Sequence, residues 1–193
     1  MADFHDSQDP NTITWTDFER DLRALGRSER TLQSYRESAE QLAGHWTGAD
    51  LLTLGKSQVL DYLIAVRRQH SGATELVRYR SLHRYFAWAV AEGFLERSPL
   101  AGVPLPRISQ KVVPVPAQEV LRALLAACQG TDFDQVRDTA VIRVLAECGL
   151  RLSELAGLTV ADVDMGPLSQ VRVTGKGDKE RYVPFSNRTG KRR

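Results

Sequence analysis

The chain has 193 residues, of which 42% are hydrophobic and 26% are charged, and its formal net charge is +2. This composition is ordinary for a globular protein with a hydrophobic core and excludes a mainly disordered chain. No apolar run is long enough to cross a membrane, and no basic-then-apolar signal opens the chain, so the sequence predicts a cytoplasmic protein. Cys128 and Cys148 lie in apolar helical patterns without a CxxC spacing, so buried thiols are expected rather than a metal site or a disulfide.

Four helical patterns fill the first half of the chain. The first is expected to begin at Thr16, where Glu19 has the spacing of a capping box. The second is expected to begin at Ser28 and the third at about Ser57. The fourth is expected over residues 73–92, with an apolar stripe made of Leu76, Tyr79, His83, Phe86 and Val90.

A change of composition near residue 98 predicts a domain boundary. The stretch "RSPLAGVPLPRISQKVVPVPAQ" holds five prolines, a density that excludes a helix and favours an extended linker over residues 98–115. The predicted organisation is a loose polar N-terminus over 1–12, a four-helix domain over 13–97, the linker, and a second domain over 116–193.

The second domain begins with two amphipathic helical patterns, of which the later one, around Val141 to Leu145, is expected to be deeply buried. A short helix is expected over 153–156. The period then changes from helical to two, and "SQVRVTG" and "ERYVPF" alternate as strands. The sequence therefore predicts a mostly α protein with a small β-hairpin or sheet.

Charge is unevenly distributed along the chain. The first 50 residues contain ten acidic residues and five arginines. Residues 51–110 contain eight basic residues and four acidic ones. Arg80 and Arg84 are four apart on the fourth helix, with Arg78 further round. A basic helix face is compatible with nucleic acid, although a solvated surface accounts for any single arginine equally well.

The stretch "GKGDKERYVP", residues 175–184, places two glycines and several charges at a predicted hairpin tip. Glycines at such a tip let the backbone approach a ligand closely, and Lys176 can reach an anion there. Lys179 and Arg181 add further positive charge. The alternative is an ordinary solvated hairpin. A phosphate-binding P-loop is excluded because the GxxxxGK[ST] pattern is absent.

The stretch "ECGLRLSELAGL" places Arg151 between a predicted buried helix and the start of the next one. A guanidinium beside helix N-terminal amides favours an oxyanion or a phosphate. The alternative is a structural arginine paired with Glu154 or Glu147. A helix-turn-helix interpretation is disfavoured because strands follow where a recognition helix would be needed.

Together, "GLR-x-SEL-x-GL" and, about two dozen residues later, "GKG-x-KER-x-VP" resemble the tyrosine recombinase (phage integrase) family, in its Xer-like branch. The resemblance covers nearly the whole chain. It implies a four-helix, SAM-like core-binding domain, with "SLHRYFAWAVAEGFLERSPLAGVPLPR" as its last helix and exit. It also implies that residues 116–193 form the first part of an α+β catalytic domain.

The resemblance assigns roles to individual residues. Arg151 corresponds to the arginine that holds the scissile phosphate, and Lys176 to the general acid toward the leaving 5′ oxygen. Glu154 supports the arginine. The resemblance implies double-stranded DNA and other recombinase protomers as partners, with no metal and no small-molecule cofactor. Further expected DNA contacts are Arg78, Arg80, Arg84, Lys179 and Arg181.

The sequence departs from the family pattern in its second half. The family also needs a His-x-x-Arg motif and a C-terminal tyrosine nucleophile, whereas the four histidines here all lie in the first half and the last tyrosine, Tyr182, is on the hairpin. The chain is therefore expected to be a C-terminally truncated member that does not cleave DNA alone, because no covalent step is possible without the nucleophile. We also expect an exposed apolar surface around the predicted buried helix and an aggregation-prone second domain.

Three functions remain open at this point. The first is a recombinase acting in site-specific recombination or integration. The second is a non-catalytic DNA-binding remnant or regulator of a full-length recombinase. The third is a helical interaction protein whose basic face meets an acidic protein partner.

Overall fold

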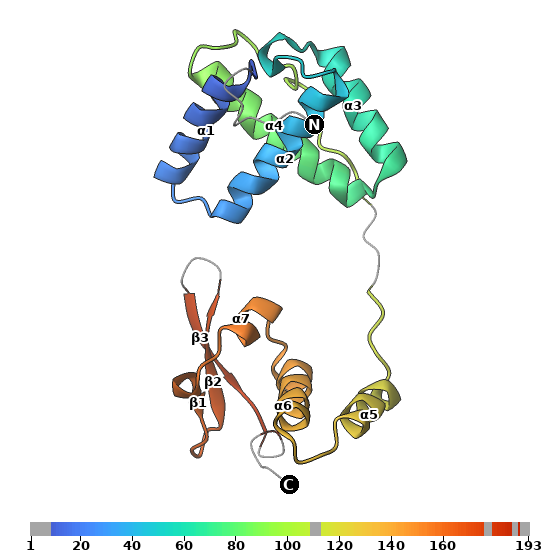
Figure 1. Ribbon diagram of the computed structural model, residues 1–193, viewed down its shortest axis with the longest axis vertical. Coiled ribbons are helices and arrows are strands. Elements are labelled where there is room, and N and C mark those ends of the chain that lie inside the picture. The colour runs from blue at the N-terminus through green and yellow to red at the C-terminus, as the bar shows by residue number, and fades with distance from the viewer. Residues whose placement is uncertain (1–8, 109–112, 176–178, 187–188, 190–193) are drawn as a thin grey trace. The chain divides into compact units, whose positions relative to one another are not determined.

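The computed structural model describes residues 9–108, 113–175, 179–186 and 189, which belong to two compact units, residues 1–111 and 112–193 (Figure 1). In its described part, the first unit contains helices and turns but no strand. The second unit combines helices with a small antiparallel sheet. The protein is thus mostly α with a small sheet, as the sequence predicts.

Four α-helices form the described part of the first unit, and two of them begin at a serine that caps the helix. Ser28 caps the second helix, because its hydroxyl accepts a hydrogen bond from the Thr31 amide at 3.4 Å, and Ser71 caps the fourth by accepting from the Thr74 amide at 3.2 Å. The helices are α1 (Thr12–Ala24), α2 (Glu29–His45), α3 (Lys56–Gln69) and α4 (Gly72–Ala91), with a short 3₁₀ turn η1 (Leu51–Thr53) between α2 and α3.

The first helix begins at Thr12, one turn earlier than predicted, because Asn11 fixes the chain before it. Asn11 is fully buried rather than part of a loose terminus. Its side-chain amide donates to the Ala49 carbonyl at 3.1 Å, and its side-chain oxygen accepts from the Leu51 amide at 2.8 Å. The predicted start at Thr16 was wrong since Asn11 uses its polar atoms for long-range contacts that local sequence signals do not reveal.

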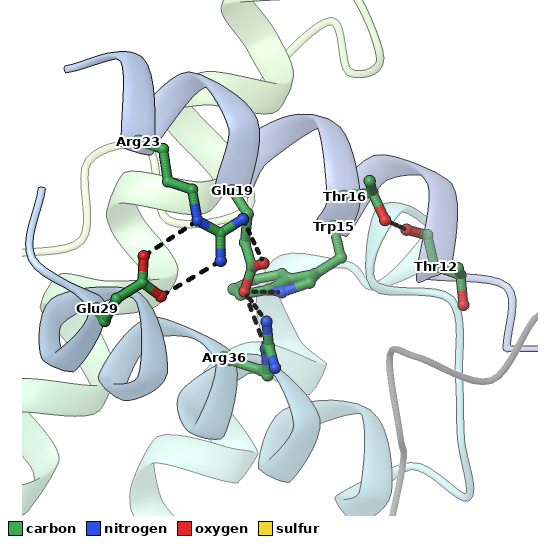
Figure 2. Close-up of polar contacts among 7 residues, drawn as sticks. All are labelled: Thr12, Trp15, Thr16, Glu19, Arg23, Glu29 and Arg36. Atoms are coloured by element: carbon green, nitrogen blue, oxygen red, sulfur yellow. Dashed lines mark hydrogen bonds and ion pairs between the residues drawn. The ribbon is translucent and has the colours of Figure 1, made fainter. Parts of the chain in front are cut away.

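Glu19, expected to cap a helix, instead joins α1 to α2 from a buried position (Figure 2). Its carboxylate accepts hydrogen bonds from the Trp15 indole at 2.9 Å and from the Arg36 guanidinium of α2, and Arg23 pairs with it at 3.4 Å. A buried carboxylate is tolerated only when it is paired and hydrogen-bonded in this way. The cluster fixes how α1 lies against α2.

Aromatic rings from α1 and α4 fill the centre of the first unit. Phe18 is 1% exposed, and its ring centroid lies 5.2–5.4 Å from those of Trp15, Tyr85 and Trp88. Such large buried rings supply much of the hydrophobic stabilisation of a small domain.

The buried face of α4 differs by about one residue from the predicted stripe. His83, expected in the apolar stripe, is exposed, whereas Leu82 and Ala89 are fully buried. The apolar pattern of α4 is broad enough to allow more than one helical phase, and packing against α2 and α3 selects the observed one.

The start of the Pro-rich segment packs on the first unit. Leu100 is 1% exposed within the core, and the Tyr79 hydroxyl of α4 donates to the Val103 carbonyl at 2.5 Å. The chain therefore leaves this core only after Val103.

The second unit contains α5 (Gln118–Ala127), α6 (Phe133–Cys148), α7 (Leu152–Ala156), a 3₁₀ turn η2 (Val160–Asp162), β1 (Val163–Asp164), β2 (Gln170–Gly175) and β3 (Lys179–Pro184). The strands pair antiparallel in the order β1-β2-β3, and β2 and β3 form the predicted hairpin. Strand β1 was not predicted, because two residues are too few for a recognisable alternation.

The core of the second unit is small. Among the described residues it consists of four buried side chains, namely Leu150, Val171, Val173 and Phe185. The predicted deep burial of the helix around Val141 was wrong, since no residue of α6 is buried within the described part of the chain. Cys128 and Cys148 are half-buried rather than core thiols. The apolar side of α5 is also open, with Val120 and Leu124 each half exposed.

Candidate nucleic-acid interface and phosphate site

The exposed face of α4 carries positive charge that is not paired with a carboxylate among the described residues. Arg80 and Arg84 are both exposed and, within the described residues, neither takes part in an ion pair. The single carboxylate within α4, Glu75, is buried on the other side and pairs with Arg67 of α3 at 2.7 Å. Since residues four apart are neighbours on a helix surface, Arg80 and Arg84 lie side by side on the same exposed face of α4.

Arg78, predicted as a third DNA contact, lies differently on α4. It is half-buried, and its guanidinium donates to the Ser38 hydroxyl of α2 at 3.1 Å. Its buried Nε atom has no hydrogen-bond partner among the described residues. The exposed arginines of the candidate interface on this helix are therefore Arg80 and Arg84.

In the second unit, Glu154 of α7 brings two arginines together. The Arg151 amide donates to its Oε2 atom and the Arg151 guanidinium to its Oε1 atom, each at 2.8 Å. From β3, the two terminal nitrogens of Arg181 donate to the same two oxygens at 2.7 and 2.9 Å. The Glu154 side chain is 2% exposed, and its four accepted hydrogen bonds satisfy the buried carboxylate.

The predicted pairing of Arg151 with Glu154 is therefore present. Most of the Arg151 side chain nevertheless remains accessible to solvent. Its side chain is 69% exposed and gives a single guanidinium nitrogen to Glu154. The remaining nitrogens face solvent at the N-terminal end of α7. Glu147, the other partner considered, instead accepts from the Ser186 amide at 2.7 Å.

The strand register explains why Arg181 reaches α7. Arg181 is paired across the hairpin with the buried Val173, so both side chains lie on the packed face of the sheet. Lys179 lies on the same face, opposite Gly175, and is exposed. Lys176 lies outside the described residues.

The two arginines lower the pKa of Glu154 to about 2, with the hydrogen bond from Arg181 as the largest cause. Glu154 in return raises the pKa of Arg181. A second carboxylate, Asp162, has its pKa lowered to about 2, first by the Thr159 hydroxyl and then by the amide of Thr159 and the side chain of Arg172. Both carboxylates are therefore ionised at neutral pH.

These shifts predict how the second unit responds to acid. Because the pKa of Glu154 is lowered on folding, its contribution to stability is complete above its ordinary pKa of 4.5 and is lost as the pH falls toward 2. In amide hydrogen exchange at matched pH, protection of α7 and β3 in Glu154→Gln should therefore vary less with pH between 4.5 and 2 than in the parent chain. Asp162→Asn serves as the control, since it removes the second shifted carboxylate and leaves the contribution of Glu154 in place. Parallel curves for the parent chain and Glu154→Gln would contradict this assignment.

No cluster of three or more histidine, cysteine, aspartate or glutamate side chains able to hold a metal ion occurs among the described residues. Within the same part of the chain, no helix is long and apolar enough to span a membrane.

Residues 115–192 match the family model described as "Phage integrase family". The chain is 37% identical over 169 residues to tyrosine recombinase XerC of Mycobacterium tuberculosis, an alignment that covers 83% of this chain and 56% of the relative. It is 32% identical over 163 residues to tyrosine recombinase XerD of Pseudomonas aeruginosa, covering 83% and 54%. A lambda integrase tetramer bound to a Holliday junction has the same fold, with a TM-score of 0.72 at 16% identity over 93% of this chain and 53% of the other.

The chain thus has the fold of the integrase and recombinase structures, with a helical unit followed by helices and a hairpin. It belongs to the tyrosine recombinase, or phage integrase, family. The chain spans about half the length of the curated relatives it matches.

The sequence singled out every side chain of the Glu154 cluster, but the pairing of Arg181 with Glu154 was not predicted. Both terminal nitrogens of Arg181 bond to Glu154 in the structure, and its expected contact with DNA stays a prediction. The signal was available, because alternation along "KERYVP" places Arg181 on the same face as Val183 and opposite to Glu180 and Tyr182.

Proposed function

We propose that this chain binds double-stranded DNA as part of site-specific recombination or integration. The observation that carries the proposal is the face of α4, where Arg80 and Arg84 are exposed and form no ion pair among the described residues, in a member of the tyrosine recombinase family. A 20-residue helix with such a face fits the major groove, where arginines contact phosphates and set affinity. We propose a cytoplasmic location for this activity, as the sequence predicts.

We infer that the second unit supplies part of a phosphate site. Arg151 would hold the scissile phosphate and Lys176 would protonate the leaving 5′ oxygen, because phosphoryl transfer needs its developing charge neutralised and its leaving oxygen protonated. Glu154 would orient Arg151 through both the amide and the guanidinium. Lys179, exposed on the same hairpin face as Arg181, is proposed as an additional DNA contact. No metal or small-molecule cofactor enters this proposal.

The groups that would complete the reaction are not found in these 193 residues, which contain no His-x-x-Arg sequence and whose last tyrosine is Tyr182. We therefore propose binding without strand cleavage by these residues alone. Other recombinase protomers are the proposed protein partners, and a DNA-binding remnant that occupies recombination sites alongside a full-length recombinase is the alternative role.

The proposal is tested by electrophoretic mobility shift with a duplex of about 30 base pairs, run with and without SDS. We expect a shifted band in the native gel that disappears in SDS, because binding is not covalent. Absence of a shift at low salt would remove the DNA-binding proposal. An SDS-resistant band would show that a nucleophile within these residues attacks DNA, and would overturn the proposed absence of cleavage.

A further inference from the structure

We infer that Arg181 is a positioning residue that supplies the countercharge for Glu154, so that Glu154 orients Arg151 without cancelling its charge. This inference rests on the proposed phosphate-binding role of Arg151. It assigns to Arg181 a function that differs from direct contact with DNA.

The argument begins with how the two arginines share one carboxylate. Arg181 gives both terminal nitrogens to Glu154, at 2.7 and 2.9 Å, in the two-point geometry of a guanidinium–carboxylate pair. Arg151 gives one guanidinium nitrogen at 2.8 Å, and its second bond to Glu154 comes from its backbone amide. Arg181 is therefore held by both terminal nitrogens of its guanidinium group. Arg151 is held by its backbone amide and by one guanidinium nitrogen, so its other guanidinium nitrogens are not used by Glu154.

Exposure supports the same division. The side chain of Arg151 is 69% exposed, that of Arg181 is 41% exposed, and that of Glu154 is 2% exposed. A phosphate approaching from solvent therefore meets Arg151 more readily than Arg181. The buried carboxylate is shielded from the phosphate by the guanidinium groups around it.

Charge counting shows what Arg181 adds. Two arginines and one glutamate give the cluster a net charge of +1. With Arg181 neutralised, Arg151 and Glu154 sum to zero, and a phosphate meets an ion pair rather than a cation. With Glu154 neutralised as well, the net charge returns to +1. The inference thus predicts that the second substitution repairs the first.

A second consequence concerns the hairpin. Arg181 is on β3, and Glu154 and Arg151 are at the start of α7, so the two-point pair ties the hairpin to the helix that carries Arg151. Lys179 lies two residues before Arg181 on the same strand face. The pair therefore holds β3, which also carries the positively charged Lys179, against the helix that begins next to Arg151.

The test measures the affinity of the full chain for duplex DNA, by fluorescence anisotropy at one fixed salt concentration, in five variants. Arg151→Ala and Arg181→Met should each weaken binding about tenfold, the effect of losing one charge-assisted contact. Arg181→Met/Glu154→Gln should recover most of that loss, and Arg181→Lys, which keeps the charge, should stay within about threefold of the parent chain. The fifth variant, Arg172→Met, is the control and should change affinity less than twofold. Arg172 is about as exposed as Arg181, at 42%, but it lies on the opposite face of the hairpin and pairs with Asp162.

The outcomes separate the possibilities. If the double variant binds as weakly as Arg181→Met, or if Arg181→Lys does, Arg181 acts as a direct DNA ligand or through its shape, and the inference is wrong. If Arg151→Ala or Arg181→Met binds like the parent chain, the cluster does not meet DNA, and the inference fails while DNA binding by α4 stands. If the parent chain itself does not bind duplex DNA, the proposed function fails. Amide exchange of β2 and β3 in each variant shows that the hairpin is still folded, so that a loss of affinity reports charge.

Discussion

Reversing the charge of Arg80 and Arg84 together is expected to weaken binding to duplex DNA by at least about a hundredfold. Each arginine that contacts a phosphate makes a charge-assisted hydrogen bond with a net value of roughly 1.5–3 kcal/mol, and a glutamate in its place repels the same phosphate. The dependence of binding on salt should flatten as well, because each lost phosphate contact lowers the slope of log K against log salt by about 0.9. Anisotropy titrations of Arg80→Glu/Arg84→Glu from 50 to 200 mM salt measure both quantities.

Arg20→Glu is the matched control for each single reversal, Arg80→Glu and Arg84→Glu. Arg20 is also an exposed helical arginine of the first unit, with a side chain that is 71% exposed, but it lies on α1 and pairs with Asp17. Its reversal should leave affinity within about twofold, since a surface pair contributes little. Equal losses in the control and in the α4 variants would mean that net charge, rather than this helix face, governs binding.

Phe18→Ala is expected to destabilise the first unit by about 3–5 kcal/mol, the usual cost of removing a fully buried phenyl ring. Phe18 is 1% exposed and its ring contacts those of Trp15, Tyr85 and Trp88, so the cavity cannot be filled by small shifts of one neighbour. All three tryptophans of the chain lie in the first unit, at positions 15, 46 and 88. Tryptophan fluorescence during urea unfolding therefore reports this unit selectively.

Leu124→Ala is the control for the core substitution. Leu124 of α5 is half exposed in the second unit, so its truncation should cost less than about 1 kcal/mol and leave the tryptophan transition where it is. A Phe18→Ala variant that unfolds within 1 kcal/mol of the parent chain would contradict the aromatic core described above.

Local signals in the sequence predicted most elements of this fold. The predictions failed where contacts between residues far apart in the sequence determine where a helix begins or which face it buries. Ser28 is an N-cap that acts on its own amides, and it marked the start of α2 correctly. The start of α1 was missed because Asn11 bonds to the chain about 40 residues away. The phase of α4 was missed because its sequence is apolar over a wide arc, and packing placed His83 outside.

In the candidate site, too, local contacts could be predicted from the sequence whereas contacts between distant residues could not. Spacing alone suggested that Glu154 pairs with Arg151, because three residues along a helix bring side chains together. Alternation along the strand indicated that Arg181 lies on the packed face of the hairpin, but its pairing with Glu154 could not be predicted, since that depends on how the hairpin packs against α7. The burial of α6 was overestimated because an apolar helical pattern indicates only that a face needs covering.

The central claim, that this chain is a DNA-binding member of the recombinase family, is tested most directly by titrating the parent chain with duplex DNA over a range of salt, beside polyglutamate as an acidic polypeptide. We predict that log K for DNA falls linearly with log salt, with a slope steeper than about −2 for the several phosphate contacts proposed, and that polyglutamate binds far more weakly at every salt concentration. Equal binding of polyglutamate and DNA would point to an acidic protein partner, and no DNA binding at 50 mM salt would contradict the account.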